Sequence, residues 1–241
     1  DWQSIIKFFI MFPLYTVAIH PEEKWVKKSY IVICILSIPF LAAFFSWYSV
    51  WRTGEVASEM TFISGIEDFL YDQGVSINFV KRAYMYQDRI PADQIYILEF
   101  LHSGILARLL GITVYHGNTV EHALYGGSFT HSLGYVVLGA TYLVGKGTGS
   151  SYIAELYQDF SYIGIFFGNI FYSLIIARIN QFKGRQRIFW MSVRFYIITQ
   201  ILWAPRGSYT GFISNLLAPS TIICFVCIYG IANLIKARHK D

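Results

Sequence analysis

Residues 30–50 read YIVICILSIPFLAAFFSWYSV, and this stretch decides the fold class. It contains no charged side chain, and its length matches the ~20 apolar residues that a helix needs to cross the hydrocarbon core of a bilayer. A helix also satisfies all of its backbone hydrogen bonds internally, as an apolar environment requires. The stretch therefore predicts a membrane-spanning helix and an integral membrane protein.

The composition of the whole chain supports the same class. Of its 241 residues, 55% are hydrophobic and only 14% are charged, whereas soluble globular proteins carry about 25% charged residues. The net charge of +4 does not indicate nucleic-acid binding. Because the chain begins at Asp1 rather than Met, we expect residues 1–241 to be a single membrane unit cut from a longer chain.

Further apolar stretches predict an all-α polytopic protein with four to five transmembrane helices. They are residues 160–176, 188–203 and 211–235, with residues 5–19 as a fifth span or an interfacial helix. Lys and Arg in short loops stay on the cytoplasmic side of a membrane. If the spans alternate, the three basic clusters all fall on that side: Lys24, Lys27 and Lys28; Arg178, Lys183, Arg185 and Arg187; and Lys236, Arg238 and Lys240.

The long segment 52–158 is then extracytoplasmic. Its acidic residues outnumber its basic ones, and a segment of this length without secondary structure would be unusual. We expect helices over residues 94–112 and 132–144, and both are apolar enough to be interfacial, re-entrant or packed under a lid. If residues 132–144 crossed the membrane instead, the basic clusters downstream would no longer agree.

Arginines at the membrane surface are candidates for binding phosphate, because a guanidinium can bind two phosphate oxygens at once. Arg206 follows a predicted span in a turn that contains Pro205 and Gly207, although it can equally extend to lipid headgroups. Arg108 lies on the apolar face of the predicted helix 94–112. Arg82 and Arg89 form a basic patch that binds phosphate or an acidic sugar, or is simply solvated.

The stretch 145–157, GKGTGSSYIAELY, lacks the spacing of a nucleotide-binding P-loop. It predicts a flexible turn that leads into a helix, with Ser151 as the N-cap. Glu155 lies about one turn into this helix, and is a candidate general base or arginine partner. His116 and His131 are further candidates, because imidazole titrates near neutral pH. Gly164 and Gly168 predict a close approach of two membrane helices.

Residues 149–160 read GSSYIAELYQDF and are followed by Gly164 and Gly168. This motif resembles the corresponding stretch of Wzy-type O-antigen and capsule polymerases. The resemblance implies a multi-pass, GT-C-like glycosyltransferase of the bacterial inner membrane. Its substrates would be sugar repeats on undecaprenyl pyrophosphate at the outer face. By position, Arg206 and Arg108 would hold the pyrophosphate, and Ser150, Ser151, Glu155 and Tyr157 lie in the shared motif. Such polymerases usually have ten or more spans, whereas four or five are found here.

The resulting hypothesis is a glycosyl transfer without metal or cofactor, in which arginine stabilises the pyrophosphate leaving group and Glu155 or a loop histidine deprotonates the acceptor. The expected partners are the lipid-linked oligosaccharide and membrane lipid, with a chain-length regulator and a flippase, but no nucleic acid. Two alternatives remain open: an O-antigen ligase, and a non-enzymatic flippase or transporter. The transporter would use inward polar residues such as Asn169, Arg194 and Gln200.

Overall fold

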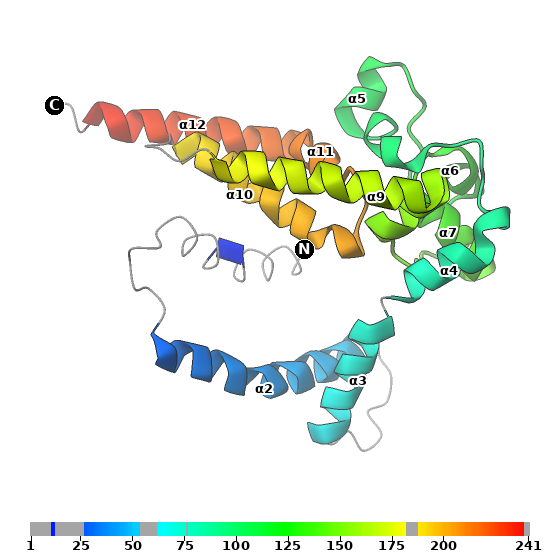
Figure 1. Ribbon diagram of the computed structural model, residues 1–241, viewed down its shortest axis with the longest axis horizontal. Coiled ribbons are helices and arrows are strands. Elements are labelled where there is room, and N and C mark those ends of the chain that lie inside the picture. The colour runs from blue at the N-terminus through cyan, green and yellow to red at the C-terminus, as the bar shows by residue number, and fades with distance from the viewer. Residues whose placement is uncertain (1–10, 13–26, 54–61, 76, 182–187, 239–241) are drawn as a thin grey trace. The chain divides into compact units, whose positions relative to one another are not determined.

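The computed structural model describes residues 11–12, 27–53, 62–75, 77–181 and 188–238 (Figure 1). Every regular element in these ranges is helical, as the apolar sequence patterns predict. The chain divides into two compact units, residues 1–78 and residues 79–241.

The first unit contains helices α2 (Lys28–Thr53) and α3 (Phe62–Val75), which pack against each other. α2 covers the predicted helix 30–50 and extends beyond both of its ends. The rings of Phe40 and Phe62 lie 5.4 Å apart. α3 lies against the backbone of α2 at Gly65, where a Cβ would be in ordinary van der Waals contact, 3.4 Å from the Ala43 Cα.

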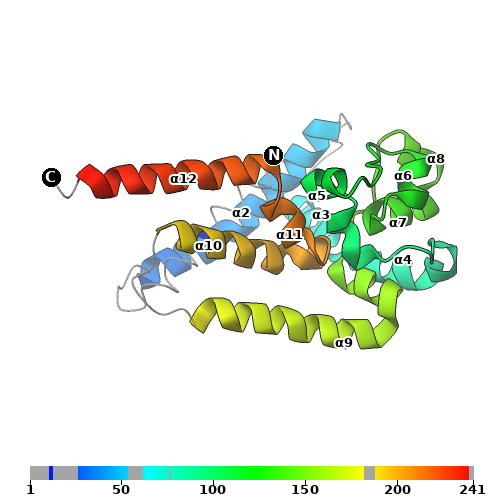
Figure 2. The ribbon, with the colours of Figure 1, turned by 90° about the horizontal axis from the view of Figure 1, so that it is seen from above.

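Three long helices of the second unit run roughly parallel, with α10 between α9 and α12 (Figure 2). Their bounds are Tyr152–Gln181 for α9, Ile188–Trp203 for α10 and Pro219–Arg238 for α12. Short helices gather at one end of this bundle (Figure 1). They are α4 (Asn78–Tyr86), η1 (Gln87–Arg89), η2 (Tyr96–Leu101), α5 (Gly104–Leu109), α6 (Val120–Tyr125), α7 (Phe129–Leu138), α8 (Ala140–Leu143), η3 (Ala204–Arg206) and α11 (Gly211–Leu216).

α9 bends sharply at Phe160 and Ser161, whose backbone angles are not helical. The bend lets the first part of α9 fold back, so that Leu156 packs onto Gly164 and Gly168. A Cβ on Gly164 would lie 2.5 Å from the Leu156 carbonyl oxygen, and a Cβ on Gly168 would lie 2.5 Å from its Cδ1. The predicted close approach is confirmed for these glycines, but their partner is the first part of the same helix rather than a second membrane helix.

Two buried apolar clusters hold the second unit together, and α9 contributes to both. Around Ala154 the cluster comprises Ala83, Ile90, Tyr96, Phe129 and Leu133. Around Leu156 it comprises Tyr172, Ile201, Ala204 and Tyr209. The first part of α9 thus joins the short helices to the long ones, and residues 154–156 lie at the centre of the unit.

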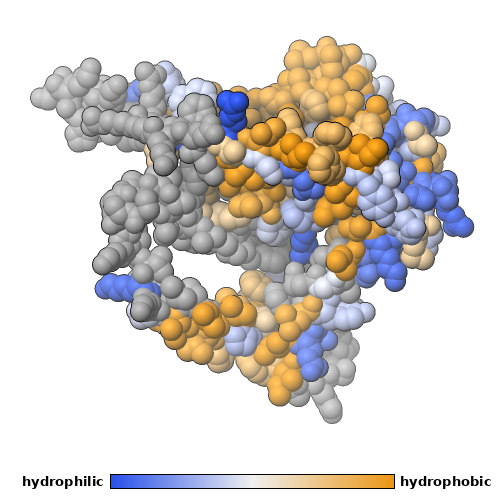
Figure 3. Space-filling view, in the orientation of Figure 1, coloured by the Kyte–Doolittle hydropathy of each residue, from blue (hydrophilic) through white to orange (hydrophobic). Residues whose placement is uncertain are grey.

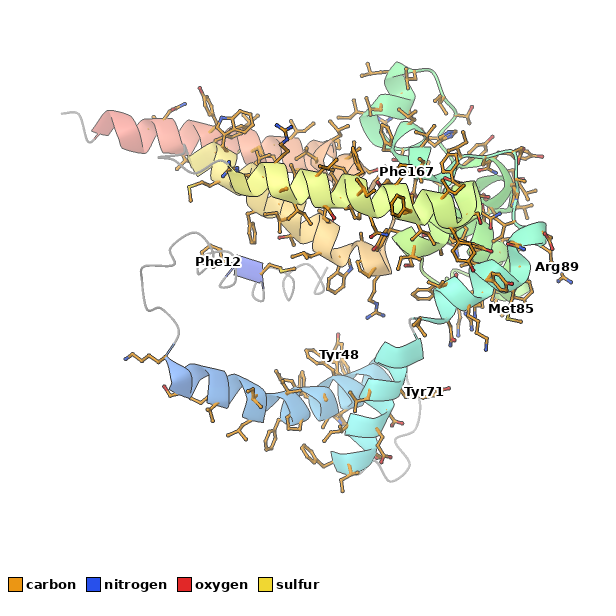
Figure 4. The ribbon with its side chains drawn as sticks, viewed as in Figure 1. Phe12, Tyr48, Tyr71, Met85, Arg89 and Phe167 are labelled. Atoms are coloured by element: carbon orange, nitrogen blue, oxygen red, sulfur yellow. The ribbon has the colours of Figure 1, made fainter. Side chains whose placement is uncertain are left out.

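By length and apolar composition, one helix in the described residues can cross a membrane, over Tyr152–Ile179. Large apolar side chains point outward from it, among them Ile163, Phe166 and Phe167, and the face of α9 seen in Figure 3 is largely hydrophobic (Figures 3 and 4). A lipid environment would cover such a surface. Shorter apolar helices are Ile35–Phe45, Phe129–Leu138 and Pro219–Ile231. The predicted four to five spans stay a prediction, and residues 5–19 lie, apart from Met11 and Phe12, outside the described residues.

Helix boundaries differ from three of the sequence expectations. Residues 94–112 form η2 and α5 rather than one helix, because the chain breaks before Gly104, which has a left-handed backbone. Gly139, also left-handed, divides the expected helix 132–144 into α7 and α8. The expected helix 211–235 is divided because Pro219 has no N–H to donate and so begins a new helix. By contrast, α10 has the predicted bounds.

The helix ends of the second unit are arranged as the predicted membrane orientation requires. α9 ends, α10 begins and α12 ends at the same end of the bundle, opposite the short helices (Figures 1 and 2). The basic cluster that begins at Arg178 and the one that begins at Lys236 flank these helix ends. Some members of the three basic clusters lie outside the described residues: Lys24, Lys183, Arg185, Arg187 and Lys240. The helix ends that these clusters flank thus lie on one side, as the basic pattern predicts.

Candidate functional site

Glu155 lies in the first part of α9 and is completely buried. Its Oε1 accepts a hydrogen bond of 2.9 Å from the Ser150 hydroxyl. Its Oε2 accepts one of 2.7 Å from the backbone N–H of Tyr209. The carboxylate therefore ties the turn after Arg206 to the glycine- and serine-rich motif. Both oxygens are used within the protein, so this arrangement gives Glu155 a positioning role, and its predicted catalytic role stays a prediction.

A second carboxylate on the same face of α9, one turn later, holds the start of η2. The two oxygens of Asp159 accept hydrogen bonds from the backbone N–H groups of Tyr96 and Ile97, at 3.0 and 2.8 Å. The hydroxyl of Thr210 donates to the Ile97 carbonyl at 2.9 Å. These contacts fix η2 against both α9 and the turn that contains Arg206.

Tyr209 anchors this turn in the aromatic interior. Its ring stacks on Tyr172 with centroids 4.6 Å apart, and its hydroxyl donates to the Gly168 carbonyl at 3.1 Å. The hydroxyl of Tyr172 in turn donates to the Tyr209 carbonyl. Burial raises the pKa of Tyr209 to about 12, and the nearby Tyr152 adds to this shift. Tyr209 therefore stays a neutral structural group.

Arg206 ends η3, the single turn that follows α10, and its side chain is exposed. Pro205 and Gly207 predict a helix break here, and the structure confirms it: α10 ends at Trp203, and Gly207 is extended. The chain is anchored three and four residues after Arg206, through Tyr209 and Thr210. The structure thus presents an exposed Arg206 side chain between the end of α10 and a segment that is anchored through Tyr209 and Thr210.

Beside this turn lies a polar cluster around Glu99, which the sequence patterns of the predicted site did not indicate. Glu99, in η2, lies near Ser128, Ser208, His102 and His122, and all four groups favour the ionised form of its carboxyl and so lower its pKa. Burial raises the pKa of Glu99, while the two hydroxyls and the two histidines partly offset this effect. The available signal was a carboxylate in an otherwise apolar run, from Ile95 to Leu101.

The two predicted histidines lie in different surroundings. His131 is half-buried: its ring stacks on His122 with centroids 3.6 Å apart, and its Nδ1 hydrogen-bonds the Tyr142 hydroxyl at 2.8 Å. Burial, with a smaller contribution from His122, lowers the pKa of His131 to about 4. His131 is therefore neutral at neutral pH and is linked to the Glu99 cluster through His122. His116 is exposed in the loop before α6.

The serines and the tyrosine of the motif are mostly engaged within the protein. Ser150 and Ser151 are each only 3% exposed. The N–H of Glu155 donates to the Ser151 carbonyl, and α9 begins directly after Ser151, in agreement with the predicted N-cap position. Tyr157 is partly buried, and the centroids of its ring and the Tyr84 ring lie 5.9 Å apart. Direct contact of these residues with substrate stays a prediction.

The remaining arginines lie on separate elements. Arg108 is exposed on α5, which packs against η2. Arg82 is partly buried in α4, and Arg89 is exposed in η1 with its guanidinium 5.7 Å from the centre of the Tyr86 ring. Figure 4 shows Arg89 pointing away from α9. The four predicted arginines thus lie on four different elements, α4, η1, α5 and η3.

A groove of about 690 Å³ runs along α9 between Tyr162 and Ala177. Its lining is mostly apolar, with Asn169 and Ser173 among its polar members, and it includes none of the residues predicted for a polymerase site. Across the part of the chain that the structure describes, no group of three or more His, Cys, Asp and Glu side chains is arranged to hold a metal ion.

Comparison with known proteins gives one match. The family model described as O-antigen polysaccharide polymerase Wzy matches residues 3–239, which is nearly the whole chain. Neither curated proteins nor solved structures yielded a match.

Proposed function

The chain belongs to the O-antigen polysaccharide polymerase Wzy family, and from this we propose that its Arg206 turn, held in place by Glu155, binds the pyrophosphate of a lipid-linked glycan during transfer. The family polymerises O-antigen repeat units, so the chain is a glycan-polymerising enzyme of the bacterial inner membrane that uses lipid-linked repeats. This selects the polymerase over the ligase and the transporter, the two alternatives that the sequence leaves open.

The proposed reaction transfers the growing glycan from undecaprenyl pyrophosphate to the incoming lipid-linked repeat at the outer face of the membrane. The bond from the sugar to the pyrophosphate breaks as a new glycosidic bond forms to the acceptor hydroxyl. Negative charge then accumulates on the leaving pyrophosphate. A fixed guanidinium stabilises such charge without having to reorganise, and it binds two oxygens at once.

The contact between the Tyr209 N–H and Glu155 Oε2, at 2.7 Å, carries this proposal. It joins the motif that resembles other polymerases to the turn that presents Arg206, although the two are far apart in sequence. The Ile97 carbonyl of η2, which accepts from Thr210, and the Tyr172 hydroxyl of α9, which donates to the Tyr209 carbonyl, hold the same segment. An exposed arginine on so constrained a backbone suits a binding role better than contact with mobile headgroups.

The arrangement of the helices supports a site at the outer face. The basic clusters flank one end of the long helices, and η3 with the short helices lies at the other end (Figure 2). Since basic loops remain cytoplasmic, the Arg206 turn belongs on the opposite side. The extracytoplasmic assignment of residues 52–158 and the GT-C-like class belong to the same proposal.

We assign secondary roles to the other predicted residues. Arg108 contributes to binding the pyrophosphate from the neighbouring helix α5, while Arg82 and Arg89 contact the glycan further out. Ser150, Ser151 and Tyr157 support the site from the interior of the protein. A chain-length regulator and a flippase are the proposed protein partners, and the proposed transfer needs no metal.

Arg206→Ala and Arg206→Lys in the full-length protein test the proposal, after deletion of the native gene in the host. The surface polysaccharide is separated on a gel, and the amount of protein in the membrane is measured. We expect Arg206→Ala to replace the ladder by single repeats and Arg206→Lys to restore it only in part, because an ammonium lacks the planar fork. The matched control is Arg178→Ala, which removes an exposed arginine at the opposite end of α9. A normal ladder from Arg206→Ala would refute the assignment.

A further inference from the structure

Three tyrosine rings form a continuous strip on the surface of the second unit. The centroids of the Tyr84 and Tyr157 rings lie 5.9 Å apart, and those of the Tyr157 and Tyr162 rings lie 5.3 Å apart. The two outer rings are open to the surroundings, because Tyr84 is 58% exposed and Tyr162 is 71% exposed. Tyr157, which contacts both, is partly buried. We call these three residues the tyrosine strip.

The elements that carry the tyrosine strip are packed against each other. Tyr84 lies on α4, whose Ala83 is completely buried in the apolar cluster around Ala154 of α9. The Gln158 side chain of α9 also donates a hydrogen bond of 3.2 Å to the Gln87 carbonyl, which directly follows α4. The rings are therefore already arranged before a partner arrives, which lowers the entropic cost of binding.

The bend of α9 brings two of the three rings together. Tyr157 lies before the bend at Phe160 and Ser161, and Tyr162 lies directly after it. In an unbroken helix, side chains that face each other are three or four residues apart, whereas these two are five apart and would point in different directions. The continuity of the tyrosine strip thus depends on the bend.

The tyrosine strip is separate from the contacts that hold the Arg206 turn. Glu155 and Asp159 are four residues apart and share the face of α9 that holds this turn and η2. Tyr157 lies midway between them in sequence, so it projects from the other side of the helix. A partner of the strip is therefore a part of the substrate that is remote from the pyrophosphate.

Polar residues accompany the tyrosine strip on its α4 side. Lys81 lies one turn before Tyr84 on α4, Gln87 and Asp88 follow in η1, and all three are exposed. The surface around α4 is largely hydrophilic, next to the apolar face of α9 (Figure 3). Hydrocarbon chains would leave these polar groups without hydrogen-bond partners. A partner that combines apolar surface with many hydroxyls would satisfy both kinds of group.

A sugar ring has this combination. Its C–H bonds form an apolar face that can stack on an aromatic ring, because the negative charge on the face of the aromatic ring attracts their hydrogens. The hydroxyls at its edge both donate and accept hydrogen bonds, so they suit phenol, ammonium, amide and carboxylate groups alike. Tyrosine also provides such a contact at low entropic cost, because its side chain has only two rotatable bonds.

We propose that the tyrosine strip is a binding surface for the growing glycan, whose sugar rings, away from the reacting end, stack on Tyr84 and Tyr162. Tyr157 supports the two outer rings from the interior. The strip thus holds the polymer on the enzyme beyond the site of transfer. The identity of the partner, a glycan, rests on the proposed function.

Binding of lipid-free polysaccharide to the purified full-length protein in detergent tests this surface. The probe is the host's own polysaccharide, cleaved from its lipid and fractionated to chains of several repeats. We expect Tyr84→Ala and Tyr162→Ala each to weaken binding by about two- to tenfold, the contribution of one aromatic contact. The matching phenylalanine variants keep the ring and should bind nearly as tightly as the wild type. The control is Tyr125→Ala, which removes an exposed tyrosine on α6.

Two results would overturn the assignment of the tyrosine strip. One is wild-type protein that does not bind the lipid-free polysaccharide. The other is an unchanged affinity in both Tyr84→Ala and Tyr162→Ala. If this unchanged affinity came with less protein in the membrane, the strip would instead be an aromatic anchor at the membrane surface.

Arg206→Ala, titrated in parallel, separates the strip from the proposed pyrophosphate site. It should bind the lipid-free polysaccharide like the wild type, because this probe carries no pyrophosphate. If Arg206→Ala polymerises normally while the alanine variants of the strip lose affinity, the arginine assignment is wrong and the strip stands. If Arg206→Ala is inactive while the strip variants bind normally, only the strip is wrong.

Discussion

Glu155 and Tyr209 are joined by a hydrogen bond of 2.7 Å between a side-chain oxygen and a backbone N–H, across 54 residues of sequence. The contact is a tertiary one, because Glu155 lies in α9 and Tyr209 follows η3. The bond connects the motif GSSYIAELY with the turn of Arg206. A substitution at Glu155 that removes the hydrogen bond to Tyr209 can therefore displace the Arg206 turn, because this bond holds the turn.

Substitutions at Glu155 should separate a positioning role from a catalytic one. In Glu155→Gln the amide oxygen still accepts from Tyr209, and the Ser150 hydroxyl can turn to accept from the amide nitrogen. Glu155→Ala leaves a buried N–H unsatisfied, which costs about 1–3 kcal/mol. We expect Glu155→Gln to keep most polymerisation and Glu155→Ala to lose both polymer and thermal stability. Equal inactivity of the two variants, with Glu155→Gln as stable as wild type, would instead support a catalytic role.

Sequence patterns predicted the long helices well, because an apolar run of sufficient length leaves the backbone few alternatives. α10 has the predicted bounds, and α2 covers residues 30–50. The short helices were predicted less well. The single helix expected over 94–112 does not form, since the chain breaks before Gly104, which has a left-handed backbone. The start of η2 is capped by Asp159, a partner so distant in sequence that no local pattern reveals it.

The candidate site was predicted in a similar, partial way. Glu155 and Arg206 stood out because a carboxylate and an arginine are unusual in apolar surroundings, and the structure links their segments. Glu99 did not stand out, because its partners Ser128 and Ser208 come from other elements. Arg82 and Arg89 were grouped with the site by charge alone, yet they lie on α4 and η1. Charge in a sequence thus indicates a possible site, but not which groups share it.

The bend in α9 predicts an unequal tolerance at its two glycines. A Cβ on Gly164 would meet the Leu156 backbone, which cannot move without shifting the helix. A Cβ on Gly168 would meet only the end of the Leu156 side chain. We expect Gly164→Ala to lower the free energy of unfolding by about 1–3 kcal/mol, the cost of overpacking, and Gly168→Ala to cost less. Gly147→Ala is the control, since nothing lies within 4 Å of its position. Thermal unfolding in detergent measures the order; equal losses at both glycines would contradict the packing described.

His131 should make the protein less stable in mild acid. Its pKa is lowered from 6.5 to about 4, chiefly by burial. Above about pH 6.5 the ring is neutral in both states, but between 6.5 and 4 the unfolded chain binds a proton that the folded protein does not. The free energy of unfolding therefore falls as the pH falls through this window. His131→Gln, which can still hydrogen-bond Tyr142, should weaken this dependence when thermal unfolding is followed from pH 7 to pH 5. The exposed His116, changed to Gln, should leave it as in wild type. An unaltered slope in His131→Gln would show that other groups cause the acid sensitivity.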